Sequence, residues 1–187
     1  SHGLSKRSDK VSAHMTTLAT AMKASGRHTV LRAGYVTHAS DETLWSGYDD
    51  AAFSTSGDFK HTAEAVLDAT LAAVRGAAKG PLFATAVLGD ITAPYLPRGD
   101  AWSAHWPSEK RAPWDARDGR KQLQRQRASG KTPSRETLNY WQALRRGKVD
   151  EVATALTAFL NALDALPDTR VMIVGLAGDG PFPGSGA

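Results

Sequence analysis

Three short apolar runs limit what this chain can fold into, because they are its clearest strand candidates. Residues 28–37 (HTVLRAGYVT) are rich in β-branched and aromatic side chains, and residues 82–88 (LFATAVL) lie between a proline and a glycine. Residues 170–176 (RVMIVGL) are apolar without alternation, which predicts a strand buried on both faces. A further short extended piece is expected at residues 43–46. The chain can therefore build only a small sheet.

Helical spacing of apolar residues accounts for much of the remaining chain. This spacing predicts helices over residues 10–25 and 59–75. A third helix is expected to begin at Pro133, since proline is favoured at the first helical position. We expect that helix to end at Gly147 and a separate helix to cover residues 150–163.

These elements predict a single α/β or α+β domain, a small mixed sheet packed by helices, with a long basic loop. Of the 187 residues, 10–176 are expected to form one globular domain. Residues 1–9 are expected to be a disordered or added end, and residues 177–187 a tail rich in glycine and proline. Residues 90–131 contain four prolines and three tryptophans, which indicates a partner-binding or functional loop, or one carrying short helices.

Composition excludes several classes of site. The chain has no cysteine, so it contains neither disulfides nor thiolate nucleophiles. No apolar run approaches the ~20 residues of a membrane span, so we expect none. The six histidines include no pair at zinc-binding helical spacing, and we expect no metal. Together these features favour a cytoplasmic protein, or a secreted one without disulfides.

Positive charge is concentrated between Lys110 and Lys148, which we call the basic segment. It holds twelve basic and three acidic residues, whereas the net charge of the whole chain is only +4. Such a segment attracts nucleic acid or an acidic protein partner or inhibitor, although it also fits a solvated, arginine-rich loop. Aromatic residues interleaved with or beside these cations would add base stacking, which favours a non-enzymatic binding or assembly protein, including a viral or phage structural component. They are Trp102, Trp106, Trp114, Tyr140 and Trp141.

A second candidate site lies in residues 43–67 (TLWSGYDDAAFSTSGDFKHTAEAVL). Here an indole (Trp45), a hydroxyl (Ser46) and a carboxylate (Glu64) could converge on a cationic aromatic substrate such as nicotinamide attached to ribose. Each residue also has a structural interpretation. A glutamate in a first helical turn is favoured by the helix dipole, and a tryptophan is favoured in a core.

This block resembles the ADP-ribosyl cyclase / NAD glycohydrolase family. The pair Trp45-Ser46 matches the family's Trp-Ser element, and Thr62, Glu64 and Leu67 match three of six positions in its Thr-Leu-Glu-Asp-Thr-Leu segment. The resemblance implies an enzyme that cleaves the nicotinamide–ribose bond of NAD. NAD is then the substrate and no cofactor is required.

The resemblance also implies roles for residues farther along the chain. By order and approximate spacing, Trp106 takes the place of the family's second active-site tryptophan. Glu136 takes the place of its later catalytic glutamate, and residues 170–176 the place of its closing strand. Animal members are rich in disulfides, so this cysteine-free chain is more similar to bacterial toxin relatives.

Arg32 supports an alternative with related chemistry. It lies on an expected strand, and residues 54–56 read Ser-Thr-Ser, which resembles the arginine and serine elements of mono-ADP-ribosyltransferases. In that fold the arginine holds a phosphate of NAD. The Glu-x-Glu or Gln-x-Glu pair of that family is missing from this chain.

Overall fold

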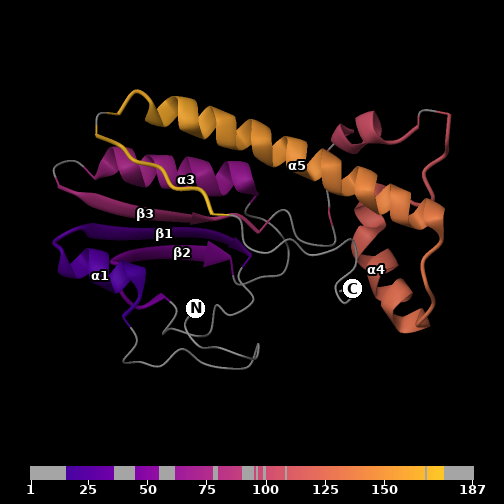
Figure 1. The fold of residues 1–187 in the computed structure, drawn as a ribbon, viewed down its shortest axis with the longest axis horizontal. Helices are drawn as coiled ribbons and strands as arrows, with labels where there is room; N and C mark the ends of the chain where they lie inside the picture. Colours follow the sequence, from indigo (N-terminus) through magenta and orange to yellow (C-terminus); the bar gives the residue numbers. More distant parts are fainter. Residues whose placement is uncertain are drawn as a thin grey trace. The chain divides into compact units, whose positions relative to one another are not determined.

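The chain divides into two compact units, residues 1–89 and residues 90–187. This computed structural model describes residues 16–35, 45–54, 62–77, 80–89, 95, 97–98, 100–107, 109–166 and 168–174. For Tyr35, Ser54, Arg120, Leu123 and Arg127 only the backbone is described. Figure 1 shows the elements of both units, and each unit is described by itself.

The first unit contains a parallel sheet of three strands, which confirms the α/β class. Its strands are β1 (His28–Tyr35), β2 (Asp50–Ser54) and β3 (Leu82–Val87), in the order β2-β1-β3. The register places Val30 opposite Asp50 on one side and Ala84 on the other. The strands predicted at 28–37 and 82–88 are therefore confirmed over residues 28–35 and 82–87, and residues 36 and 37 lie outside the described part of the chain.

Residues 45 and 46, the described part of the extended piece expected at 43–46, are not extended; residues 43 and 44 lie outside the described residues. Trp45 ends a helical turn, and Ser46 and Gly47 form a turn in which Gly47 has a φ of +101°. The strand follows at residues 50–54 (DAAFS), which are weak strand formers. Pairing with β1 makes residues 50–54 a strand despite this weak preference. The prediction of an extended piece was wrong at positions 45 and 46, which lie in a helical turn and a tight turn.

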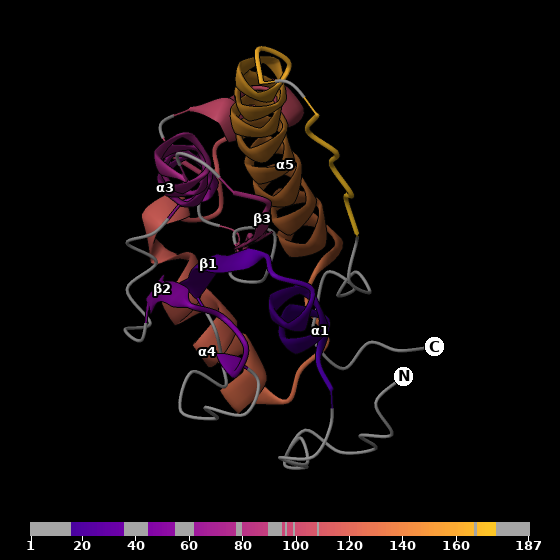
Figure 2. The ribbon, with the colours of Figure 1, turned by 90° about the vertical axis from the view of Figure 1, so that its left-hand side faces the viewer.

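Helices cover both faces of this sheet. Figure 2 shows α1 (Leu18–Ala24) and α3 (Ala63–Gly76) on opposite faces. Each begins at a threonine whose hydroxyl accepts a backbone N–H of the first turn. Because both faces are covered, the successive residues Val30 and Leu31 are both buried, at 2% and 0% exposure. The helix predicted at 10–25 is confirmed over residues 18–24, whereas residues 16 and 17, which precede and cap it, are not helical; the helix predicted at 59–75 is confirmed from residue 63. Residues 10–15 and 59–61 lie outside the described part.

The second unit is helical in its described residues. It contains two short 3₁₀ turns, η1 (Ala101–His105) and η2 (Ala116–Asp118), and the helices α4 (Gly119–Ser129) and α5 (Arg135–Leu163). Residues 90–131 therefore carry short helices where they are described, which was one of the expected alternatives. α5 begins after Ser134, whose hydroxyl accepts the Thr137 N–H at 3.1 Å, so the helix starts two residues later than expected.

α5 continues through Gly147, which corrects the predicted break. The helix has 29 residues and is about 43 Å long. Gly147 is fully buried in its middle, and a Cβ there would approach the Trp102 backbone within 2.6 Å. A glycine at position 147 permits this close approach, because it has no Cβ. The sequence analysis had interpreted the same glycine as the end of a helix.

The predicted strand at residues 170–176 is not formed where it is described. Residues 170–174 are extended without strand pairing, and Val171, Met172, Ile173 and Val174 are 48–76% exposed. The expectation of burial on both faces was wrong. Residues 175 and 176 lie outside the described residues.

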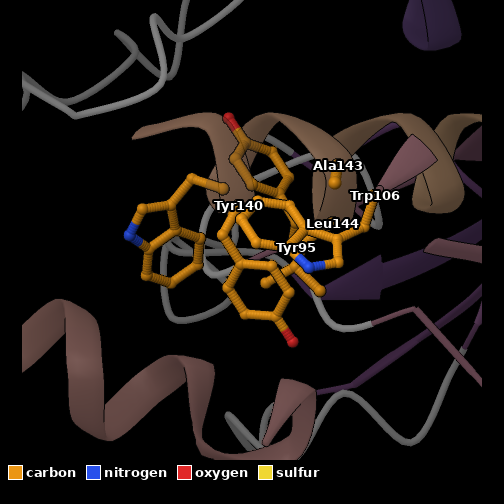
Figure 3. Packing of buried hydrophobic residues seen from close by; sticks show 6 residues of the cluster. Tyr95, Trp106, Tyr140, Ala143 and Leu144 are labelled. Atoms are coloured by element: carbon orange, nitrogen blue, oxygen red, sulfur yellow. The ribbon is translucent and has the colours of Figure 1, made fainter. Parts of the chain in front are cut away.

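Aromatic side chains form the core of the second unit. Tyr140 and Leu144 of α5 are completely buried, and Tyr95 and Trp106 pack around them (Figure 3). Trp102, Trp106 and Trp114 each meet the Tyr140 ring edge-on, with centroid distances of 5.3, 5.0 and 4.8 Å. We call these four side chains the Tyr140 cluster.

Candidate functional site

Arg32 of β1 is engaged with a neighbouring strand. Its guanidinium nitrogens donate to both carboxylate oxygens of Asp50, at 3.0 and 2.6 Å, and one of them also donates to the Leu31 carbonyl. The bidentate bond from Arg32 lowers the pKa of the Asp50 carboxyl. The charge that was expected to hold a phosphate is therefore already paired.

Trp45 and Ser46 lie before β2, beside the amino ends of the strands. The Ser46 carbonyl accepts a hydrogen bond from the Thr17 hydroxyl at 3.4 Å, and Thr17 caps the helix that precedes β1. The Trp45 ring is half-buried and packs on Phe53 with a centroid distance of 5.7 Å. Its indole N–H is enclosed and has no acceptor among the described residues. This placement gives Trp45 a packing role.

Glu64 lies toward the opposite end of the sheet. It is exposed in the first turn of α3, and α3 begins after the carboxyl end of β2. α3 runs back against β1 and β3 and ends before the amino end of β3, as Figure 1 shows. The structure does not bring Glu64 and Ser46 together, because Ser46 lies beside the amino ends of the strands and Glu64 lies at the start of α3, near the carboxyl ends.

Trp106 and Glu136 belong to the second unit. Trp106 is 8% exposed within the Tyr140 cluster, and its indole N–H donates to the Lys110 carbonyl at 2.9 Å. Glu136 is exposed in the first turn of α5, where the helix dipole favours a carboxylate. Trp106 is a core residue, and Glu136 has the environment of an ordinary helix start.

The Tyr140 cluster removes aromatic rings from the surface of the second unit. The Tyr140 hydroxyl donates to the Trp114 carbonyl at 3.0 Å, and burial raises the pKa of Tyr140 to about 12, with a further contribution from the Asp115 charge. Trp141, which is 1% exposed, packs against Trp114 and Tyr95. The expectation that these rings stack on bases is not supported, because they stabilise the fold instead.

An open hollow of about 580 Å³ lies beside this cluster. Its lining includes Arg111, Trp114 and Asp115. The opposite charges of the guanidinium and the carboxylate balance each other, so the hollow does not favour an anion. We do not place the functional site there.

Ten of the twelve cations of the basic segment have described side chains, and these ten fall into two groups. Arg145 lies 6.0 Å from the centre of the Tyr95 ring, and the buried Lys148 pairs with Glu151 at 3.0 Å. Arg145 thus contacts a ring outside α5, whereas the Lys148–Glu151 pair lies within α5. Eight others are exposed: Lys110, Arg111, Arg117, Lys121, Arg125, Lys131, Arg135 and Arg146.

α4 carries the highest density of positive charge. Its eleven residues (GRKQLQRQRAS) include four cations and no acid. At 100° per residue, positions 120, 121, 124, 125, 127 and 128 fall within about 160° of the helix circumference. The half-buried Gln122 and Gln126 lie on the other side. We call the first set of positions the cationic face of α4.

The sequence analysis located this charge but missed the helix that presents it. A run of Arg, Lys, Gln, Leu and Ala without β-branched residues favours a helix. Asp115 and Asp118 at η2 precede it, and Asp118 pairs with Lys121 at 3.4 Å. The helix propensity of these residues could have predicted α4. Apolar periodicity could not, because the segment has almost no apolar residues.

Neither a metal site nor a membrane-spanning helix is found within the described ranges. They contain no group of three His, Asp or Glu side chains placed to bind a metal ion. Nor does any described helix combine the length and the apolar character needed to cross a bilayer.

No family model, curated protein or solved structure matches this chain. The resemblance to the NAD glycohydrolases therefore rests on its motif residues alone. The cationic face of α4, on which Lys121 and Arg125 are exposed, is the strongest candidate site in the described residues.

Proposed function

We propose that this protein binds double-stranded nucleic acid through the basic segment, with the cationic face of α4 against the phosphate backbone. The composition and exposure of α4 carry the proposal. Lys121 and Arg125 are exposed one helical turn apart, and the helix holds no acidic residue. A phosphate polymer neutralises such a face and releases counterions on binding.

The dimensions of α4 suit a duplex. Eleven helical residues span about 16 Å, and the major groove of B-DNA is about 12 Å wide and admits an α-helix. The cations need no base-specific partner, because phosphate contacts are independent of sequence. We therefore expect binding without strong sequence preference.

The Tyr140 cluster argues for a duplex over a single strand. Proteins that bind single strands without sequence preference combine cations with exposed aromatic rings on which bases stack. The described aromatic residues of the second unit are buried or half-buried. Cations without stacking platforms favour a ligand whose bases are already stacked within a helix.

The cationic face also lacks what a protein partner would require. Interfaces between proteins have an apolar or aromatic centre that supplies most of the binding energy. Ala128 is the only apolar residue at the six positions of this face. The phosphates of a nucleic acid can pair with the cations of this face without an apolar centre.

The test is fluorescence anisotropy with a labelled duplex and a single strand of equal length and unrelated sequence. We expect tighter binding to the duplex, with affinity falling steeply as salt rises. If the four cations of α4 each neutralise one phosphate, log K against log salt has a slope of about −3.6. That slope corresponds to a loss of roughly 150-fold between 50 and 200 mM salt.

Charge reversal locates the interface. Arg125→Glu combined with Arg127→Glu should abolish most of the binding and flatten the salt slope. The matched control is Arg27→Glu combined with Arg75→Glu, which reverses two exposed cations of the first unit and should retain most of the affinity. Equal losses in both variants, preference for the single strand, or no binding at 50 mM salt would refute the proposal.

A further inference from the structure

Residues 171–174 (VMIV) form the most exposed apolar stretch among the described residues. The exposed fractions are 48% for Val171, 76% for Met172, 65% for Ile173 and 67% for Val174. Figure 1 draws this segment as an extended yellow tube without strand pairing. Contiguous apolar surface of this kind marks an interaction site in a folded protein.

The backbone of this segment is also unpaired within the part of the chain that the structure describes. Among the described residues, none forms a backbone hydrogen bond with residues 171–174. Valine and isoleucine favour strands, and an extended backbone offers a row of N–H and C=O groups along each edge. The segment therefore has the composition and the conformation of a strand without a neighbour.

The complementary feature is the outer edge of β3. In the sheet order β2-β1-β3, the described pairing of β3 is with β1 only, on one of its two edges. β3 has six residues and is half-buried along its length, and an unpaired strand edge presents backbone N–H and C=O groups. Exposed edges of this kind accept an added strand.

We infer that two copies of this chain associate by strand addition, residues 170–174 of one copy pairing with the outer edge of β3 of the other. Among the described residues, each copy has an apolar segment without strand pairing and a β3 edge to which no strand is paired, so a twofold arrangement would pair two segments with two edges at once. The segment and the edge match in length, at five and six residues. This inference is independent of the proposed nucleic-acid binding.

Cysteine cross-linking tests the pairing directly, because the chain has no cysteine of its own. One sample carries Ala84→Cys or Ala86→Cys in β3, and a second sample, of different mass, carries Met172→Cys or Ile173→Cys. Neighbouring residues 172 and 173 sample both faces of the added strand, and disulfides require Cα atoms about 4.4–6.8 Å apart. After mixing and mild oxidation, at least one of the four combinations should give the mixed disulfide dimer.

Leu18→Cys is the matched control, because Leu18 is also an exposed apolar residue, at 53%. It should give little mixed dimer with either β3 variant. Mixed dimer at the same yield from Leu18→Cys, or none from any of the four combinations, would overturn the inference.

Mass measurement by light scattering gives a second readout. The unmodified chain should be a dimer at micromolar concentration, and Val171→Asp combined with Ile173→Asp should shift it to a monomer. Leu18→Asp should remain dimeric, since it adds charge at an exposed apolar residue that takes no part in the inferred pairing. Met172→Pro, which removes one backbone donor without adding charge, should also weaken the dimer. A monomer at all concentrations of the unmodified chain would refute the inference.

Discussion

Gly147 of α5 lies directly against the backbone of Trp102, so closely that a Cβ at position 147 would be 2.6 Å from the Trp102 nitrogen and Cα. The obstructing atoms are backbone, and they cannot move aside as a flexible side chain could. This approach lets η1 pack on the middle of α5 and brings Trp102 to the Tyr140 ring.

Gly147→Ala should therefore destabilise the protein by about 1–3 kcal/mol, the usual range for overpacking. Helix propensity alone would give the opposite sign, because alanine is favoured over glycine by about 1 kcal/mol inside a helix. Urea denaturation measures the free energy of unfolding. The control is Gly76→Ala in α3, where the added Cβ meets nothing within 4 Å, and that variant should be neutral or slightly stabilised.

Tyr140 should control stability at alkaline pH. Its pKa is raised to about 12 by burial, so the neutral phenol is favoured in the folded state. Its contribution is complete below the ordinary value of 10.0 and is lost as pH rises toward about 12. Tyr140→Phe should lose about 1 kcal/mol at neutral pH with the bond to the Trp114 carbonyl, and should show a weaker decline between pH 10 and 12.

Ultraviolet titration of the phenolates provides the check on Tyr140. One of the four tyrosines should ionise near pH 12 in the unmodified chain, and this step should be missing from Tyr140→Phe. A titration in which all phenols ionise near pH 10 while the protein remains folded would contradict the burial of this residue.

Asp49 should control stability in acid. It accepts hydrogen bonds from Lys23 at 2.6 Å and from the Thr29 amide and hydroxyl at 2.9 and 3.0 Å. The Lys23 ammonium, followed by the Thr29 amide, holds the pKa of the Asp49 carboxyl well below its ordinary value of 3.8. Its contribution is therefore present above that value and is lost as pH falls toward the pKa of the folded state.

Asp49→Asn should lower the free energy of unfolding at pH 7, and its deficit relative to the unmodified chain should shrink below about pH 4. Urea titrations from pH 2 to pH 7 measure this difference. Asp68→Asn, an exposed change on α3, should show little deficit at any pH. A constant Asp49→Asn deficit across the whole range would show that the carboxylate charge does not stabilise the fold.

The placement of the motif residues within 43–67 leads to a separate prediction about activity on NAD. Because Ser46 and Glu64 lie at opposite ends of the sheet, we expect no release of nicotinamide when the protein is incubated with NAD. Chromatography of nicotinamide, ADP-ribose and cyclic ADP-ribose provides the measurement. Turnover that disappears in Glu64→Gln and in Trp45→Ala, with the fold intact, would restore the NAD interpretation.

The sequence by itself determined the elements whose cause is local. Thr62 and a clean apolar stripe define α3, and the apolar runs at residues 28–37 and 82–88 define β1 and β3. It also determined the position of the positive charge, since charge requires no folding to be counted. These features depend on neighbours three or four residues away, or on two-residue alternation, which a single sequence displays directly.

Tertiary structure decided what depends on distant partners. β2 is a strand because Val30 and its neighbours pair with it, although its own residues are weak strand formers. Position 147 is a glycine because the Trp102 backbone lies too close for a Cβ there, and packing of α5 buries Lys148 away from the charged surface. The tryptophans belong to the core because they pack against Tyr140, which is up to 38 residues away from them in the chain. Periodicity cannot report such contacts, since their energy depends on which distant surfaces meet and not on local spacing.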